Sequence, residues 1–424
     1  MTTTMTRALL LLLTILALDC KDKGTEPTPE RVRLTLIDTA VREAYLHIAV
    51  AAPSHNETLA LQRNGTTVMT FAAVADTNIA DTALTQTTTY LYTATVQTHE
   101  TTGKSNTIAA QTLAPTSHNF TWQTFLLGDG NGSALYDVAL INDTLAYAVG
   151  EIYLSGDPRP YNLAKWDGLQ WELKRVSYIF RGNLVTVPMR GISAFSATDI
   201  WLASGDAVHG DGSNWIGYDI RTIVGNQGLA FYRCWGLNTS NMYFVGPLGS
   251  IAYFNGTTWL QLESGTTTQI NDAWGVVNPV TGKEEVYCPT GSFFTPGDRR
   301  VLKISDGMRV DSLASPLRRL LDAAWTGSGI PLYVAGDGVF LRVGGSWSAV
   351  DIGASIYTND IRGNTLNDIF VAGDFGMIGH FNGENWQLFF EDMNRSYYTI
   401  ATKEDVVVIV GEVSSRGLVT IGRR

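Results

Sequence analysis

The stretch that decides the fold is Leu366-Asn-Asp-Ile-Phe-Val-Ala-Gly-Asp374, which continues as Gly376-Met-Ile-Gly-His-Phe-Asn-Gly-Glu-Asn-Trp386. It contains an apolar strand, a glycine turn, a second strand and an Asn-Gly pair before tryptophan. Versions of the apolar strand recur at 143–150, 198–205, 241–246, 285–289, 332–336, 366–374 and 406–411. Trp171, Trp215, Trp259, Trp347 and Trp386 follow one another at intervals of 44, 44, 88 and 39 residues. One structural unit therefore repeats along residues 119–424.

A period near 40 to 45 residues is the length of a four-stranded propeller blade. One such sheet cannot bury both of its faces alone, and radial packing of seven copies buries them against one another. The pattern resembles bacterial propellers of the broad Asp-box (sialidase-type) group, although the strict Ser-x-Asp-x-Gly-x-x-Trp box, the WD40 Trp-Asp pair and the Kelch double glycine are missing. We predict a seven-bladed β-propeller whose ring closes by pairing of residues 120–125 with residues 417–421.

Residues 31–115 predict a smaller all-β domain. Runs such as Arg31-Val-Arg-Leu-Thr-Leu-Ile37 and Ala44-Tyr-Leu-His-Ile-Ala-Val50 alternate polar and apolar side chains, which is typical of strands with one buried face. Other alternating runs lie at 59–62, 67–71, 89–96 and 106–112. The segment from Leu84 to Thr112 resembles the late strands of a fibronectin type III domain, with Tyr90 in the tyrosine-corner position. The predicted fold class is all-β: an immunoglobulin/fibronectin III-like sandwich followed by the propeller.

The first thirty residues have the features of an export signal. An apolar run from Ala8 to Leu18 has the length of a signal-peptide core, and Cys20 then opens a polar Pro/Thr-rich segment. This arrangement resembles a bacterial lipoprotein signal, in which the cysteine is lipidated; Asp19 departs from that pattern. We predict a signal peptide over 1–19, lipidation of Cys20, a tether over 20–30 and an outer-membrane or cell-surface location. Ordinary secretion and an uncleaved anchor are the alternatives.

The charge and the cysteine content argue against a nucleic-acid-binding protein and against a disulfide-stabilised fold. Lys plus Arg total 30 against 40 Asp plus Glu, giving a net charge of -10 without a basic run, so we expect no nucleic-acid partner. Three cysteines cannot form a disulfide framework. No motif calls for a cofactor, and no His/Cys spacing predicts a metal site.

The predicted function is non-catalytic binding or scaffolding, in which propeller loops recognise a protein or a glycan. Two alternatives stay open: a glycan-cleaving enzyme of the sialidase or another glycosidase type, and an assembly factor of the cell envelope. No catalytic residue is assigned, because Asp137, Asp272, Asp322 and Asp360 recur at one position of the repeat, which indicates a turn or capping role. Arg190 and Arg362 are placed at one shared inner-strand position facing the channel. The candidate ligand-binding residues are those that break the repeat: Tyr153, Arg159, Tyr161, His209, Asp211, Phe293, Phe294 and Arg299.

Overall fold

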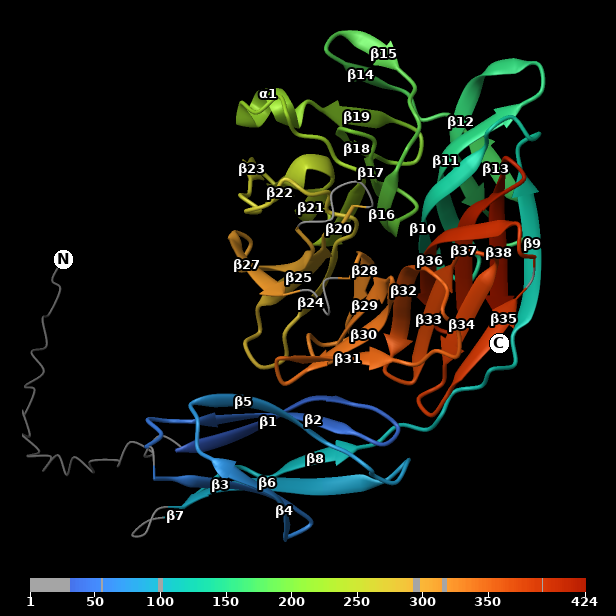
Figure 1. Cartoon of the computed structure of the whole chain (residues 1–424). Helices are drawn as coiled ribbons and strands as arrows, with labels where there is room; N and C mark the ends of the chain where they lie inside the picture. Colours follow the sequence, from blue (N-terminus) through green and yellow to red (C-terminus); the bar gives the residue numbers. More distant parts are fainter. Residues whose placement is uncertain (1–30, 55, 98–101, 293–297, 315–318, 391) are drawn as a thin grey trace, which may run out of the picture.

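The computed structural model describes residues 31–54, 56–97, 102–292, 298–314, 319–390 and 392–424. Cys20, Phe293 and Phe294 lie outside these ranges. The described chain is almost entirely β-structure, as predicted (Figure 1). Among the helices of the described part, none is long and apolar enough to span a membrane.

The N-terminal part of the described chain forms two sheets that face each other. One has the order β1-β2-β5 and the other β4-β3-β6-β7, with β8 also paired to β6. Leu34, Leu46, Leu59 and Tyr92 belong to the buried core between them. The strands are β1 (Val32–Thr39), β2 (Ala44–Val50), β3 (Thr58–Arg63), β4 (Thr66–Ala72), β5 (Asp76–Asp81), β6 (Thr89–Gln97), β7 (Thr102–Lys104) and β8 (Ile108–Gln111). Strands β5 and β7 lie outside the predicted alternating runs.

Seven four-stranded antiparallel sheets follow in the described residues, and they form the blades of the propeller (Figure 1). Blade 1 comprises β10 (Ala134–Asn142), β11 (Leu145–Leu154), β12 (Asp157–Trp166) and β13 (Trp171–Lys174). Blade 2 comprises β16 (Gly191–Ser196), β17 (Asp199–Ala203), β18 (Ala207–Gly210) and β19 (Trp215–Tyr218). Blade 3 comprises β20 (Arg233–Asn238), β21 (Asn241–Val245), β22 (Ile251–Phe254) and β23 (Trp259–Gln261). A hairpin of β14 (Tyr178–Phe180) and β15 (Asn183–Val185) precedes blade 2, and α1 (Ile220–Val224) follows it; η1 (Pro247–Gly249) lies within blade 3.

Blades 4 to 7 complete the ring. Blade 4 comprises β24 (Trp274–Val277), β25 (Glu284–Pro289), β26 (Arg300–Ser305) and β27 (Arg309–Ala314), and blade 5 comprises β28 (Leu321–Trp325), β29 (Leu332–Gly336), β30 (Gly338–Val343) and β31 (Ser346–Val350). Blade 6 comprises β32 (Thr358–Thr365), β33 (Asp368–Gly373), β34 (Met377–Phe381) and β35 (Trp386–Phe390). Blade 7 comprises β36 (Arg395–Lys403), β37 (Val406–Val413), β38 (Arg416–Arg423) and β9 (Thr121–Leu127).

The two ends of the propeller meet in blade 7, as predicted. Strand β9 supplies the outermost strand and runs antiparallel to β38, with Phe125 opposite Val419 and Gln123 opposite Ile421. The Phe125 ring also contacts Trp166 of blade 1, with 5.1 Å between ring centroids. One strand from the start of the propeller is thus hydrogen-bonded to the last strand of the chain.

The second strand of each blade explains the apolar runs in the sequence. These strands are buried along almost their whole length, as in β29 and β33. Neighbouring blades cover both faces of such a strand, so successive side chains are apolar on both sides.

The ring has two faces, which we name by the inner strands. At the mouth face the inner strands begin, as at Ala134 and Leu321; at the turn face they turn into the second strands, as after Asn142 and Thr365.

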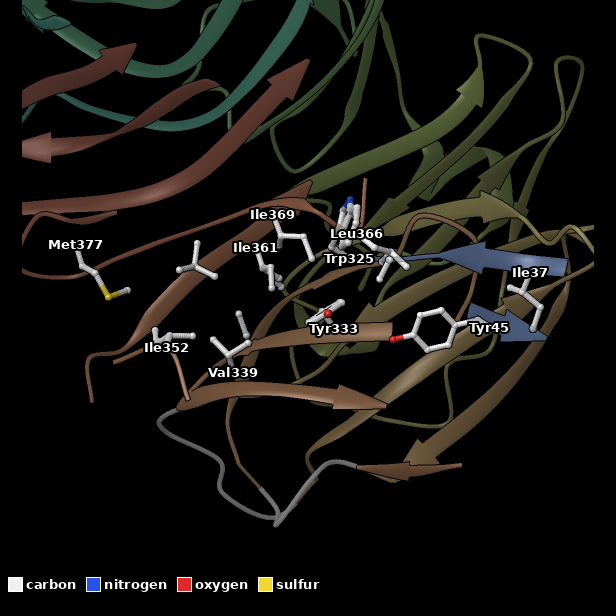
Figure 2. Packing of buried hydrophobic residues seen from close by; sticks show 14 residues of the cluster. Ile37, Tyr45, Trp325, Tyr333, Val339, Ile352, Ile361, Leu366, Ile369 and Met377 are labelled. Atoms are coloured by element: carbon white, nitrogen blue, oxygen red, sulfur yellow. The ribbon is translucent and has the colours of Figure 1, made fainter. Parts of the chain in front are cut away.

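The N-terminal sandwich contacts the turn face at blades 5 and 6. Ile37 and Tyr45 belong to one buried cluster with Trp325, Tyr333 and Ile369 (Figure 2). Polar contacts reinforce this cluster: the Ser328 hydroxyl donates to Asp38 at 2.8 Å, the Asn367 amide donates to the Ala114 carbonyl at 2.5 Å, and Arg42 pairs with Glu384 at 2.8 Å. These contacts leave the mouth face uncovered by the sandwich.

Candidate functional site at the channel mouth

One residue at the start of each inner strand lines the central channel at the mouth face. In four blades this residue is bulged out of the strand register, which re-aims its side chain. The seven rim residues, as we call them, are Tyr136, Arg190, Tyr232, Asn271, Asp322, Asn359 and Tyr398, and all of them line cavities at this end of the channel.

The register corrects two of the predicted equivalences. Arg190 and Arg362 do not share a position, because Ser193 faces Trp201 in blade 2 as Arg362 faces Phe370 in blade 6. Arg190 therefore aligns with Asn359, three residues earlier. Asp322 also lies one residue earlier than predicted, at the rim.

The acidic residue after the rim links neighbouring blades. Asp137 accepts a hydrogen bond from the Ile192 backbone N–H of the next blade at 2.9 Å, and Asp360 accepts one from Ile400 at 2.7 Å. Asp272 does the same with Ala324 at 3.2 Å. These carboxylates hold inner strands together across blades, and Asp137 and Asp360 also accept a hydrogen bond from the next backbone N–H of their own strand, so the predicted local role is joined by a link between blades.

Below the rim, a buried ion pair crosses the channel. The Arg362 guanidinium donates to both oxygens of Asp272, at 2.9 and 3.0 Å, and lies 2.7 Å from Asp360. Burial raises the pKa of Asp360, while the nearby Arg362 lowers it. At the rim, burial raises the pKa of Asp322 to about 6. The charges deep in the channel are therefore largely satisfied by protein groups.

Arg190 differs from the other channel arginines. Its guanidinium lies 4.3 Å from the centroid of the Tyr136 ring and 5.6 Å from that of Tyr232. Among the described residues, no side-chain hydrogen bond or ion pair joins this guanidinium to a protein acceptor. The adjacent Arg233 donates through Nη1 to the carbonyl oxygens of Arg190 and Tyr232, at 2.5 and 3.3 Å.

Two tyrosines of the rim each lie near a glutamate. The Tyr136 hydroxyl donates to Glu151, and Tyr153 donates to the other oxygen of that carboxylate at 3.1 Å. The Tyr398 ring stacks on Tyr136 with 6.4 Å between centroids, and burial and then the neighbouring Glu412 raise the pKa of Tyr398. Burial and then Glu151 raise the pKa of Tyr136. The rim therefore presents protonated phenols in fixed orientations.

The candidate residues predicted from the sequence are divided between the two faces. Tyr153 lies beside the rim through Glu151, and Arg159 and Tyr161 follow on β12, where the Tyr161 ring lies 3.8 Å under Arg175. Arg299 precedes β26.

His209 and Asp211 lie at the turn face, away from the rim. His209 bonds Asp199 at 2.8 Å and stacks on Trp201 at 4.2 Å. Asp211 accepts hydrogen bonds from Asn214 and Ser213 within one turn, which lower its pKa to about 2. Both side chains thus have partners within blade 2 and the adjoining Thr239 loop.

The tyrosines of the rim were missed because they follow the repeat. The candidate ligand-binding residues had been chosen because they interrupt the repeat. An alignment of the seven inner strands would have shown aromatic residues or arginine at four of the seven rim positions. In the described residues, no group of three or more His, Cys, Asp or Glu side chains is arranged to hold a metal ion.

Comparison with known proteins identifies the architecture. No family model and no curated protein matches the sequence. A solved structure of YCF48 bound to D1 peptide has a TM-score of 0.55 at 13% identity, covering 73% of this chain and 97% of that one. YCF48 from Cyanidioschyzon merolae has a TM-score of 0.51 at 14% identity, covering 71% and 98%. The shared feature is the β-propeller fold. At this identity the likeness extends to the fold alone.

Proposed function

We propose that this chain is a non-catalytic binding protein that takes a segment of a protein partner at the rim of its channel. The observation that carries the proposal is Arg190, held between Tyr136 and Tyr232 with no acceptor among the described residues. The sandwich contacts the turn face, so a partner approaching the mouth face meets the rim directly.

The chemistry of the rim favours a polypeptide. Tyrosine and arginine are the residue types most enriched at the energetic centres of protein interfaces. The Tyr136 hydroxyl is bound to Glu151 and the Tyr136 ring stacks on Tyr398, so little rotamer freedom of these two side chains remains to be lost on binding. One propeller of the same fold, YCF48, has been solved with a bound D1 peptide.

The cellular setting is also a proposal. The sequence of residues 1–30 supports a lipid tether at Cys20, which would present the mouth face outside the cytoplasm. Such a tethered propeller suits either capture of a surface protein or assembly of an envelope complex. A Cys20→Ser variant should leave the membrane fraction and appear in the soluble extracytoplasmic fraction. Retention of this variant in membranes would exclude the lipoprotein assignment.

Binding at the rim is tested by selecting random displayed peptides on the full chain. Peptides recovered on the wild type should bind an Arg190→Ala variant about 10- to 100-fold more weakly, the range expected for loss of hydrogen bonds to a charged group. The matched control is Arg309→Ala, because Arg309 is an exposed arginine at the turn face that pairs with Asp311 of its own strand. Equal affinity of all three proteins would place the ligand elsewhere.

Glycan cleavage is a second candidate, favoured by the Tyr136–Glu151 pair beside Arg190. A sialidase requires a tyrosine/glutamate pair and arginines for the substrate carboxylate. Against it, the Tyr398–Glu412 pair repeats the arrangement in blade 7, and the raised pKa of Tyr136 disfavours a nucleophilic phenolate. Hydrolysis of a fluorogenic sialoside that is lost in Glu151→Gln would establish this candidate in place of the first.

A further inference from the structure

The rim holds a guanidinium in position without neutralising it. Aromatic faces attract a cation through their quadrupole, yet they accept no strong hydrogen bond from its N–H groups. Arg190 lies against two such faces, and its backbone N–H is fixed to the Ala203 carbonyl at 2.7 Å. Its five N–H donors therefore remain for an acceptor from outside the protein.

Arg233 adds a second set of donors at the same point. Its Nη1 group bonds the carbonyl oxygen of Arg190, which ties the two residues together. No hydrogen bond from its Nε or Nη2 to another described residue accompanies this contact. Arg190 and Arg233 line one cavity of about 140 Å³ together with Gln269 and Asn271. The Asn271 amide already donates to Gly291, Leu321 and Asp322, so the main donors left for a ligand in this small polar space are the two guanidinium groups.

This donor set matches an anion rather than a neutral group. A planar guanidinium forms paired, charge-assisted hydrogen bonds with a carboxylate. The protein as a whole carries a net charge of -10, and Asp137 and Asp322 lie near Arg233, so the attraction for a carboxylate comes from direct hydrogen bonds with the guanidinium groups and not from the overall charge. The Arg362–Asp272 ion pair lies deeper in the channel and does not line this cavity.

We infer that Arg190 and Arg233 bind a carboxylate of the captured polypeptide, which anchors it in the rim. This inference rests on the proposed function and names the group that the site recognises. The carboxylate has two chemical sources, the C-terminus of the segment or an aspartate or glutamate side chain.

Three libraries of random peptides, measured against the full chain, separate the sources. The first has free C-termini and no acidic residue, the second has amidated C-termini and one acidic residue, and the third has amidated C-termini and no acidic residue. We expect the first or the second to bind at least about 10-fold more tightly than the third. Binding of the first alone identifies a terminal carboxylate, and binding of the second alone identifies a side-chain carboxylate.

Variants assign the preference to the rim. Arg190→Ala should abolish the difference between libraries, Arg190→Lys should keep part of it because the charge remains without the planar fork, and Arg309→Ala should leave it unchanged. Equal binding of all three libraries, with dependence on Arg190 retained, would overturn the carboxylate anchor and leave the proposed function standing. Absence of binding by every library to a folded wild-type protein would overturn both.

Discussion

Deletion of residues 416–424 should abolish cooperative unfolding of the propeller. The deletion removes β38, which leaves β9 without its neighbour and exposes the core of blade 7. Leu418, Val419 and Ile421 are buried, and burial of each such side chain contributes about 1.5 to 3 kcal/mol. Their sum is comparable with the whole stability of an ordinary domain. Thermal unfolding followed by circular dichroism should show a broad, early transition in place of a sharp one.

A designed disulfide provides the complementary measurement for ring closure. Thr124 and Thr420 are register partners on β9 and β38, and their hydroxyl oxygens lie 3.2 Å apart. A double variant with Thr124→Cys and Thr420→Cys should oxidise readily and raise the melting temperature relative to its reduced form, because it closes a long loop. A truncated chain that melts as sharply as the wild type, or a cysteine pair that does not oxidise, would contradict closure by β9.

Replacing Arg362 with methionine should destabilise the protein by about 3 to 5 kcal/mol at pH 7, the usual effect of removing one partner of a buried ion pair. Asp272 and Asp360 would then share the channel as unneutralised carboxylates. The pKa of Asp360, which burial already raises, would rise further in the folded variant because Arg362 no longer lowers it. The folded variant would then bind more protons, so its deficit should shrink as pH falls from 7 toward 4.

Urea unfolding at several pH values measures this effect. Arg309→Met is the control, since Arg309 is exposed and its loss should change stability by less than about 1 kcal/mol. Combining Arg362→Met with Asp272→Asn should recover part of the lost stability, because one uncompensated charge is removed. A deficit that is small and independent of pH would show that the ion pair is not buried as described.

Strands of this protein could be predicted from the sequence only where they carry a distinctive apolar pattern. The seven apolar strands were predictable because each is covered on both faces by neighbouring blades, which leaves a continuous apolar run. Strand β5, Asp76–Asp81, was missed because only Ile79 and Ala80 are apolar in it. Its place is set by pairing with β2.

The site was harder to predict than the fold. Arg190 and Arg362 both precede glycine, and this local similarity suggested an equivalence that the strand pairing contradicts, because Arg190 lies three residues earlier along its blade. The rim forms only when seven separated strand starts meet around one axis. Tyr136 and Tyr232 are 96 residues apart, from 136 to 232, and no local pattern joins them.

Site-specific photocrosslinking tests the central claim that the rim is the binding site. A photoreactive phenylalanine analogue replaces either Tyr232, which is 36% exposed at the rim, or Met308, which is 65% exposed at the turn face between β26 and β27. Both variants are expressed as the full chain in the native cells and irradiated. The account predicts a discrete protein adduct from position 232 that disappears when Arg190→Ala is added, and none from position 308. Adducts from position 308 alone, or adducts from position 232 that do not depend on Arg190, would contradict it.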